Sequence, residues 1–288
     1  MAKTPIAPTI TATMNYLGEQ RDRPFYHTTH RHLSNLTHDP REVAIADARG
    51  LSPSLSVEGF ILVADPLAGL DLRDAAVRDG AYLVHLEDRI CAATGARRLV
   101  SDVSNIRLPD PDAFQVALRT VHADYTAASA RRLLSESWDR RLPQEEGLAD
   151  TAALIAASLD ASPATRRYSR VLAINAWRPI SDPPHDLPLA LCASNSIDPG
   201  DVCEADFLEE YSETARYAGE LSLCRANPGH RWYQFPAIGQ DELMLFVEHD
   251  FARPDRPPVM HSAFADPLCP PNPAGRASVE VRTFAFFD

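Results

Sequence analysis

The sequence lacks several features that would assign it to other classes of protein. No apolar run approaches the ~20 residues of a membrane-spanning helix. The five cysteines are odd in number and form no CxxC pair, which argues against a disulfide framework or a thiolate zinc site. Only 12 glycines occur, and none of them cluster into a nucleotide-binding loop. These absences disfavour a membrane protein, a disulfide-rich domain and a dinucleotide-binding fold.

Positive charge is also scarce, because 28 lysines and arginines stand against 40 aspartates and glutamates and leave a formal net charge of −12. A nucleic-acid-binding protein should carry a basic face, so the charge argues against such a partner. The N-terminal residues hold one lysine and no continuous apolar core, unlike a signal peptide. Together with the scattered thiols, this predicts a soluble cytoplasmic protein without a membrane partner, either monomer or homodimer.

Hydrophobic residues recur in short runs of strand length, separated by Pro, Gly, Asn and Asp. The predicted strands are Ile10–Leu17, Val43–Ala48, Val57–Val63, Leu99–Arg107, Val116–Asp124, Val171–Ile180, Leu187–Ala193, Glu220–Cys224, Trp232–Phe235, Glu242–Glu248, Val259–Phe264 and Ser278–Phe287. The predicted helices are about Leu70–Thr94, which ends at Gly95, then Ala127–Leu134, Leu148–Leu159 and Glu204–Tyr217.

About eight strands from residue 116 onward are the number that a double-sheet jelly roll needs. We therefore predict one mainly β domain over residues 1–288. Its core would be a cupin-like double-stranded β-helix over residues 116–288, with a helical insertion at 125–160. Strands and helices from residues 1–115 would pack on this core.

The strongest candidate for a reactive site is a His-x-Asp step at the end of a predicted strand. His122 and Asp124 are two residues apart, so a strand directs both side chains to the same face. A histidine from a distant strand would complete a 2-His-1-carboxylate triad, the arrangement of non-haem iron(II) oxygenases. His261, in a late apolar run, is the best candidate, and His249 is its competitor. His-x-Asp alone is a weak motif, since Asp124 could instead face the start of the next helix, with Thr126 as its cap.

The last predicted strand offers an anion-binding group. Alternate residues from Arg276 to Phe286 share one face, and the small apolar residues between them form the other. Arg276 could hold the far carboxylate of 2-oxoglutarate by a bidentate pair, and Ser278 could add a hydroxyl. Arg282 is open between a salt bridge and a contact to cosubstrate or substrate. Phe284 and Phe286 would be apolar walls of the substrate pocket, or core.

Two other segments supply candidates for the lining of the site. Asn175 and Arg178 lie three residues apart, so a regular strand places them on opposite faces, and either one alone could reach cosubstrate or substrate. Arg178 could equally be packed on Trp232. Trp232 itself fits barrel packing better than a substrate wall, whereas Tyr233 could reach the cosubstrate.

Longer motifs, in order along nearly the whole chain, resemble those of a known family. They are Ile45-Ala-Asp47-Ala-Arg49, Glu58-Gly59-Phe60, Thr94-Gly95-Ala96, Asn175-Ala-Trp177-Arg178-Pro179, Pro188-Leu-Ala-Leu-Cys, Asn227-Pro-Gly-His230-Arg231-Trp232-Tyr233-Gln-Phe235-Pro236, Asp241-Glu242-Leu-Met-Leu-Phe246, His261-Ser-Ala-Phe264-Ala-Asp266-Pro267 and Arg276-Ala-Ser278-Val-Glu280-Val-Arg282. The family is the CmcJ/AsaB-like group of hydroxylases and desaturases, which includes the fungal gibberellin desaturase. One departure is Ala277, where the family usually has Glu.

The resemblance implies a double-stranded β-helix that uses Fe(II), 2-oxoglutarate and O₂ to hydroxylate, desaturate or cyclise a small natural product or amino-acid derivative. Two alternatives stay open at this point. A cupin-like metalloenzyme that does not use 2-oxoglutarate would form no succinate. A non-catalytic jelly-roll binding protein would hold no stoichiometric iron.

Overall fold

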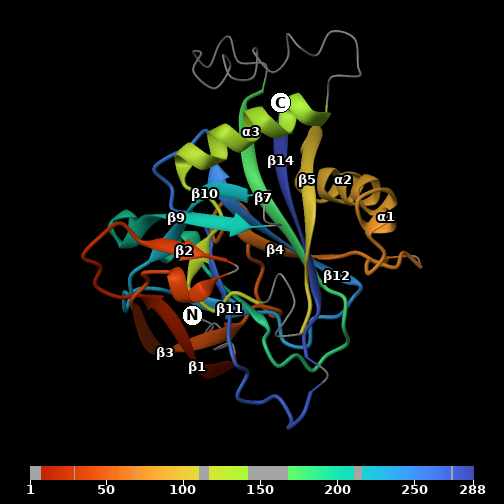
Figure 1. Ribbon diagram of the computed structural model, residues 1–288. Coiled ribbons are helices and arrows are strands. Elements are labelled where there is room, and N and C mark those ends of the chain that lie inside the picture. The colour runs from red at the N-terminus through yellow and green to blue at the C-terminus, as the bar shows by residue number, and fades with distance from the viewer. Residues whose placement is uncertain are drawn as a thin grey trace, which may run out of the picture.

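The fold is built on two β-sheets. The computed structural model describes residues 8–28, 30–67, 69–109, 117–141, 168–210, 216–273 and 275–288. In this part of the chain, nine strands form one sheet in the order β1 (Thr9–Leu17), β3 (His38–Asp47), β11 (Trp232–Gln234), β8 (Leu189–Cys192), β13 (Met260–Ala263), β6 (His122–Ala123), β10 (Arg216–Cys224), β9 (Val202–Glu210) and β2 (Phe25–His27). Five strands form the other, in the order β4 (Phe60–Ala64), β12 (Glu242–Asp250), β7 (Arg170–Pro179), β14 (Ser278–Phe287) and β5 (Arg98–Arg107) (Figure 1).

Side chains from both sheets meet in a common core. Trp177 and Phe246 of the five-stranded sheet are buried in one cluster with Leu189 and Leu191 of the nine-stranded sheet. Burial of each such large apolar side chain contributes about 1.5–3 kcal/mol to folding. The molecule is thus a mainly β, double-sheet jelly roll, as the sequence predicts. The N-terminal strands extend the two sheets edge by edge, because β1 and β3 join one sheet and β4 and β5 join the other.

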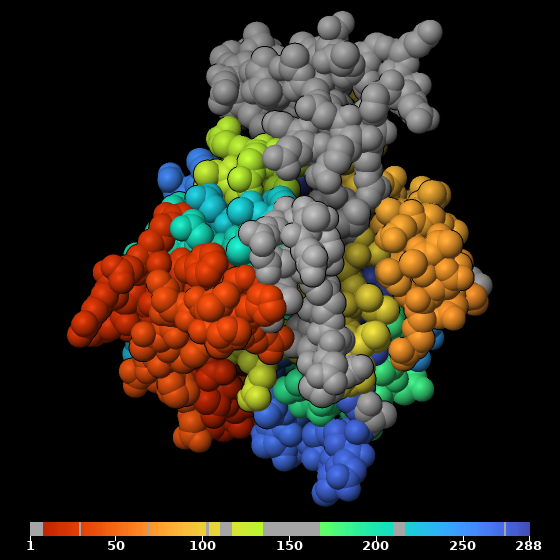
Figure 2. Space-filling view, in the orientation of Figure 1, coloured from red at the N-terminus to blue at the C-terminus, as the bar shows by residue number. Residues whose placement is uncertain are grey.

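Two helices cover the outer face of the five-stranded sheet. The predicted helix at 70–94 is present as a short α1 (Ala75–Arg78) and a longer α2 (Ala81–Thr94), and it ends at Gly95 with a φ of 75°, as predicted. The break falls at Gly80, where a Cβ atom would lie 2.7 Å from the carbonyl oxygen of Ala76. The small apolar residues from Ala277 to Ala285 pack in this layer, and Phe284 and Phe286 on the other face are buried in a separate cluster, so β14 is covered on both faces. In the space-filling view, the N-terminal strands and these helices lie on opposite sides of the molecule (Figure 2).

A third helix, α3 (Ala127–Arg141), confirms the prediction for Ala127–Leu134 and extends it. The hydroxyl of Thr126 accepts a hydrogen bond from the backbone N–H of Ser129 at 3.0 Å, which satisfies one donor of the first turn. The predicted helix Leu148–Leu159 lies outside the described residues. None of the helices in the described ranges is long and apolar enough to cross a membrane.

The predicted helix Glu204–Tyr217 is wrong. Strands β9 and β10 pair antiparallel here, from Val202 opposite Cys224 to Glu210 opposite Arg216. The segment is rich in helix-forming Glu, Ala and Leu, but apolar and polar residues alternate with a period of two from Cys203 to Phe207. Ala205 faces a buried cluster, and its neighbours Glu204 and Asp206 pair with Arg23. Packing of one face against the core outweighs intrinsic helix propensity.

Candidate metal centre and anion pocket

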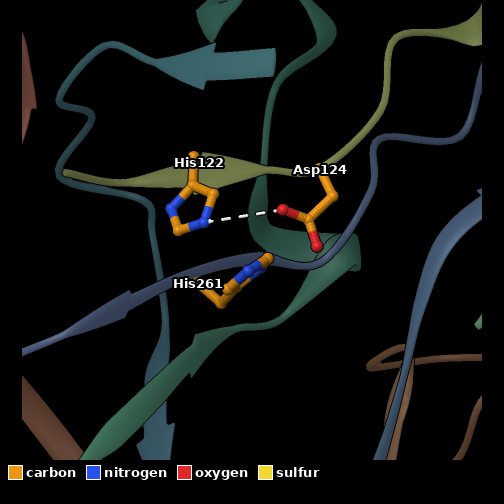
Figure 3. A group of neighbouring side chains, drawn as sticks. All are labelled: His122, Asp124 and His261. Atoms are coloured by element: carbon orange, nitrogen blue, oxygen red, sulfur yellow. Dashed lines mark ion pairs between the residues drawn. The ribbon is translucent and has the colours of Figure 1, made fainter. Parts of the chain in front are cut away.

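The nine-stranded sheet brings His122, Asp124 and His261 together. His122 on β6 and His261 on β13 are direct partners across the two strands, so their side chains point to the same face. Asp124 follows β6 immediately. One candidate ligand atom from each residue lies within 4.8 Å of the others, and all three residues are buried. Figure 3 shows the two imidazole rings and the carboxylate directed toward one another.

The protonation states suit a metal site. The Nδ1 of His122 lies 2.7 Å from the carbonyl oxygen of Thr120, which can only accept, so Nδ1 carries the proton and Nε2 keeps its lone pair. Burial lowers the pKa of His122 to about 3 and also lowers the pKa of His261, so both rings are neutral near pH 7. Burial alone would raise the pKa of Asp124, but the charge of the nearby Arg282 and smaller contributions from other neighbouring groups together outweigh burial and hold that pKa below its usual range. Two neutral imidazoles and one carboxylate are the donor set of a facial triad.

Asp124 is fixed in place by residues from the opposite sheet. Its Oδ2 accepts a hydrogen bond from Asn175 Nδ2 at 2.5 Å, and its Oδ1 lies 3.0 Å from Arg282 Nη2. Arg282 therefore makes a salt bridge, one of the two alternatives that the sequence left open, and Asn175 contacts Asp124. The sequence also made Arg282 a candidate for binding substrate and Asn175 a candidate for binding cosubstrate. In the structure, both side chains contact the carboxylate of Asp124.

Sequence reasoning missed Glu248, which completes this group. Its Oε2 accepts a hydrogen bond from the backbone N–H of Asp124 at 2.7 Å, and its Oε1 lies 3.5 Å from His261 Nδ1. Burial, and then the charge of Asp124, raise the pKa of this carboxyl well above its usual value. The available signal was a lone acidic residue at the end of a long apolar run, Leu243–Val247. A buried carboxyl needs hydrogen-bonding partners, and here they are the backbone and ring of two triad residues.

Arg276 and Ser278 form a second polar group in the same interior. Arg276 is 5% exposed, and its guanidinium carbon lies 5.2 Å from the centre of the Trp177 ring. Among the described residues, no hydrogen-bond partner reaches Arg276 Nε, Arg276 Nη1 or Ser278 Oγ, although all three atoms are buried. Burial, and then the charge of Arg107, lower the pKa of Arg276 to about 10, so it stays a cation at pH 7.

One narrow cavity connects this arginine to the triad. It is lined by Arg107, Leu118, His122, Trp177, Leu189, His261, Ala263, Arg276 and Glu280. A buried cation with open donors is costly unless an anion meets it. The side chains therefore fit a ligand that has a carboxylate near Arg276 and Ser278 and metal-binding oxygens near the triad.

Three further candidates lie on the inner face at different distances from the triad. Tyr233 pairs with Leu191, which pairs with His261, so Tyr233 lies two strands away and its ring packs on Phe60. Phe284 stacks on Tyr125, whose ring lies under the Arg282 guanidinium, so it remains a candidate for the wall of the site. Phe286 lies two residues further from Arg282 along β14 and packs on Tyr168 in the core, so the structure places it away from the site.

The prediction that Arg178 binds substrate is corrected by the structure. Arg178 is fully buried on the outer face of β7, where it forms an ion pair with Asp65 and its guanidinium lies 5.4 Å from the Tyr82 ring centre. Its Nη1 also donates to the carbonyl oxygens of Asp65 and Gln240. Residue parity explains the result, since the inner face of β7 is occupied by Asn175 and Trp177.

For Trp232, the structure supports barrel packing, which the sequence favoured over a wall of the substrate pocket. This residue lies on the opposite face of its sheet from His261, in a cluster with Met14, Ile45 and Phe264. Its Nε1 donates a hydrogen bond to the Tyr16 hydroxyl at 2.7 Å. Trp232 is therefore a packing residue of the core and not a wall of the substrate pocket.

The change Trp232→Phe should lower the free energy of unfolding by about 1 kcal/mol, because it removes this buried hydrogen bond while keeping an aromatic ring in place. Iron(II) affinity should not change. Urea denaturation and a metal titration measure the two quantities. If metal affinity fell while stability stayed unchanged, Trp232 would have to be assigned to the site and not to core packing.

Comparison with known proteins gives consistent matches over nearly the whole chain. A family model described as "Oxidoreductase/YMDC permease-like domain" matches residues 14–286. The chain is 26% identical to the Fe(II)/2-oxoglutarate-dependent dioxygenase nvfI of Aspergillus novofumigatus, covering 88% of this chain and 86% of that protein. It is 26% identical to the hydroxylase/desaturase efuI of Hormonema carpetanum, covering 98% and 96%.

Solved structures show the same fold. A structure of the iron and alpha-ketoglutarate-dependent endoperoxidase NvfI superposes with a TM-score of 0.78 at 21% identity and covers 99% of both chains. The resemblance to hydroxylases and desaturases, drawn above from sequence motifs, is confirmed by these relatives.

Proposed function

Because the chain belongs to the oxidoreductase/YMDC permease-like domain family, we propose that it is an oxidoreductase that uses Fe(II), 2-oxoglutarate and O₂ to oxidise a small organic molecule. The observation that carries the proposal is the buried His122–Asp124–His261 group, joined by one cavity to a buried arginine with open donors. The name of nvfI supports the same cofactors, and the name of efuI, a hydroxylase/desaturase, supports the same general chemistry.

Each residue of the site would have a defined role. His122, Asp124 and His261 would hold the iron and leave coordination positions open for other ligands. Arg276 and Ser278 would bind the distal carboxylate of 2-oxoglutarate by charge-assisted hydrogen bonds. Arg282 and Asn175 would keep Asp124 oriented toward the metal, and Glu248 would do the same for His261.

When bound, the iron and its cosubstrate would supply the oxidising power for removing hydrogen from an unactivated C–H bond, with succinate and CO₂ as coproducts. The protein would position the substrate and exclude water from the site. The buried triad and the apolar cluster around Trp177 and Phe246 keep bulk water from the reacting atoms. The product could be hydroxylated, desaturated or cyclised, and the geometry of the bound substrate would decide which.

We also propose a cytoplasmic enzyme that acts on small molecules rather than on nucleic acid. All five cysteines are free thiols, as expected in a reducing compartment. A net charge of −12 disfavours an approach to DNA or RNA.

Anaerobic titration tests the proposal. The protein should bind about one equivalent of iron(II), and adding 2-oxoglutarate should produce the weak visible charge-transfer band of a chelated 2-oxo acid. Under O₂, a turnover assay with candidate metabolites should release succinate. Iron binding without the band would indicate a metalloenzyme that does not use 2-oxoglutarate. Absence of iron binding would contradict the triad and favour a non-catalytic binding protein.

A further inference from the structure

Arg107 is a cavity residue for which the proposed function has no role. It is the last residue of β5, and it lines the same cavity as Arg276, His122 and His261. Its side chain is 17% exposed, and its Nη2 lies 3.9 Å from Glu280 Oε1. Among the described residues that line this cavity, Glu280 is the only acidic one, and it faces two arginines.

Strand register places Arg107 at one end of the site. In the five-stranded sheet, β14 lies between β7 and β5, and residues that are directly opposite share a face. Arg282 is opposite Asn175, and both contact Asp124. This pair marks the level of the triad.

The next residue pairs along β14 lie at increasing distance from the triad. Glu280 is opposite Trp177 on β7, one step of two residues, or roughly 7 Å, from the triad level. Ser278 is opposite Arg107 on β5, one further step along. The backbone of Arg107 therefore lies beside Ser278, two steps along the sheet from the triad level, and its side chain enters the cavity that Arg276 also lines.

Charge makes this placement significant. Arg107 and Arg276 are like charges that face one cavity, and the charge of Arg107 contributes to the lowered pKa of Arg276. Glu280, at 3.9 Å from Arg107 and 3.6 Å from Arg282, is shared between two cations. Burial, and then the charge of Asp124, raise the pKa of Glu280, which weakens it as a counter-ion. Among the described residues that line the cavity, Arg107 and Arg276 thus outnumber the one acidic residue, Glu280, and this lining suits an anion with several acceptor oxygens.

We propose that Arg107 is a cosubstrate-binding residue that, with Arg276 and Ser278, forms a two-arginine clamp for the distal carboxylate of the 2-oxo acid. The proposal rests on the 2-oxoglutarate chemistry proposed above. One arginine and one serine can satisfy one side of a carboxylate, and Arg107 approaches from the neighbouring strand to satisfy the other. The clamp would select a dicarboxylic 2-oxo acid over a monocarboxylic one.

The experiment compares two 2-oxo acids by anaerobic titration of the iron-loaded protein, using the visible band as the readout. 2-Oxoglutarate has the distal carboxylate, and 2-oxobutyrate has the same chelating end without it. Arg107→Gln should raise the Kd of 2-oxoglutarate about tenfold to a hundredfold and leave that of 2-oxobutyrate nearly unchanged. Arg107→Lys, which keeps the charge but not the planar fork, should recover part of the preference. Arg97→Gln is the matched control, because Arg97 is exposed and pairs with Asp288 at the surface.

The outcomes distinguish a failure of the clamp proposal from a failure of the proposed function. An equal loss of affinity for both acids in Arg107→Gln would mean that Arg107 acts on the metal or on folding, and would overturn the clamp. Unchanged affinity for both would overturn it as well. Both of these results leave the wild-type band intact and so leave the proposed function standing. No band with 2-oxoglutarate in the wild-type protein would instead remove the proposed function, and the clamp with it.

Discussion

Replacing His261 with alanine should abolish stoichiometric iron(II) binding and, with it, all turnover. The change removes one of three proposed ligands, all of them buried, from the one group of side chains among the described residues that could hold a metal ion. Loss of one of three protein ligands should weaken iron affinity by at least the 10–100-fold found for outer-shell changes. Anaerobic titration with iron(II), read by a competing chelator, measures the effect directly.

The matched control is His249→Ala, because His249 was the competing candidate for the same role. It is also a buried histidine on a strand of the core, but its ring packs edge-on against Phe251 at 4.7 Å between centres. Burial lowers its pKa to about 4, so it too is neutral at pH 7. The control should lose some stability and keep its iron affinity. If the two variants behaved in the opposite way, the triad would have to be reassigned to His249.

The clustering of His122, Asp124 and His261 was predictable because it depends on local parity and strand pairing. Residues two apart on a strand point the same way, so the spacing of His122 and Asp124 is enough to place both side chains on one face. The same rule divided β14 correctly into a small apolar face and a face that begins with Ser278. The donor set of iron then limited the candidate for a third ligand to a histidine on a late apolar strand. These inferences need only the period of a strand and the donor set of iron.

The partners of the arginines were not predictable, because they depend on contacts between distant segments. Arg178 meets Asp65, which is 113 residues away, and Arg282 meets Asp124 across the gap between the two sheets. No local pattern distinguishes an arginine that binds a ligand from one that binds a buried carboxylate. The prediction of a helix at Glu204–Tyr217 was wrong for a related reason. The composition favours a helix, and only pairing with β10 makes β9 a strand.

Removing the buried charge of Arg178 should be among the most destabilising single changes in the protein. Arg178 and Asp65 are both fully buried, and the loss of one partner leaves the other as an incompletely compensated charge. Asp65 keeps contacts with His85 at 2.8 Å and Arg89 at 3.0 Å, so we expect Arg178→Met to lower the free energy of unfolding by about 3 kcal/mol, the lower end of the usual range. Urea denaturation measures this quantity.

Two comparisons distinguish a stabilising ion pair from a substrate contact. The double variant Arg178→Met, Asp65→Leu should recover part of the lost stability, because it removes the orphaned carboxylate as well. The affinity of folded Arg178→Met for iron(II) and 2-oxoglutarate should equal that of the wild type, because Arg178 faces α2 and not the cavity. A variant with wild-type stability and weakened ligand binding would contradict this assignment. It would mean that Arg178 affects ligand binding through its neighbour Trp177, which lines the cavity.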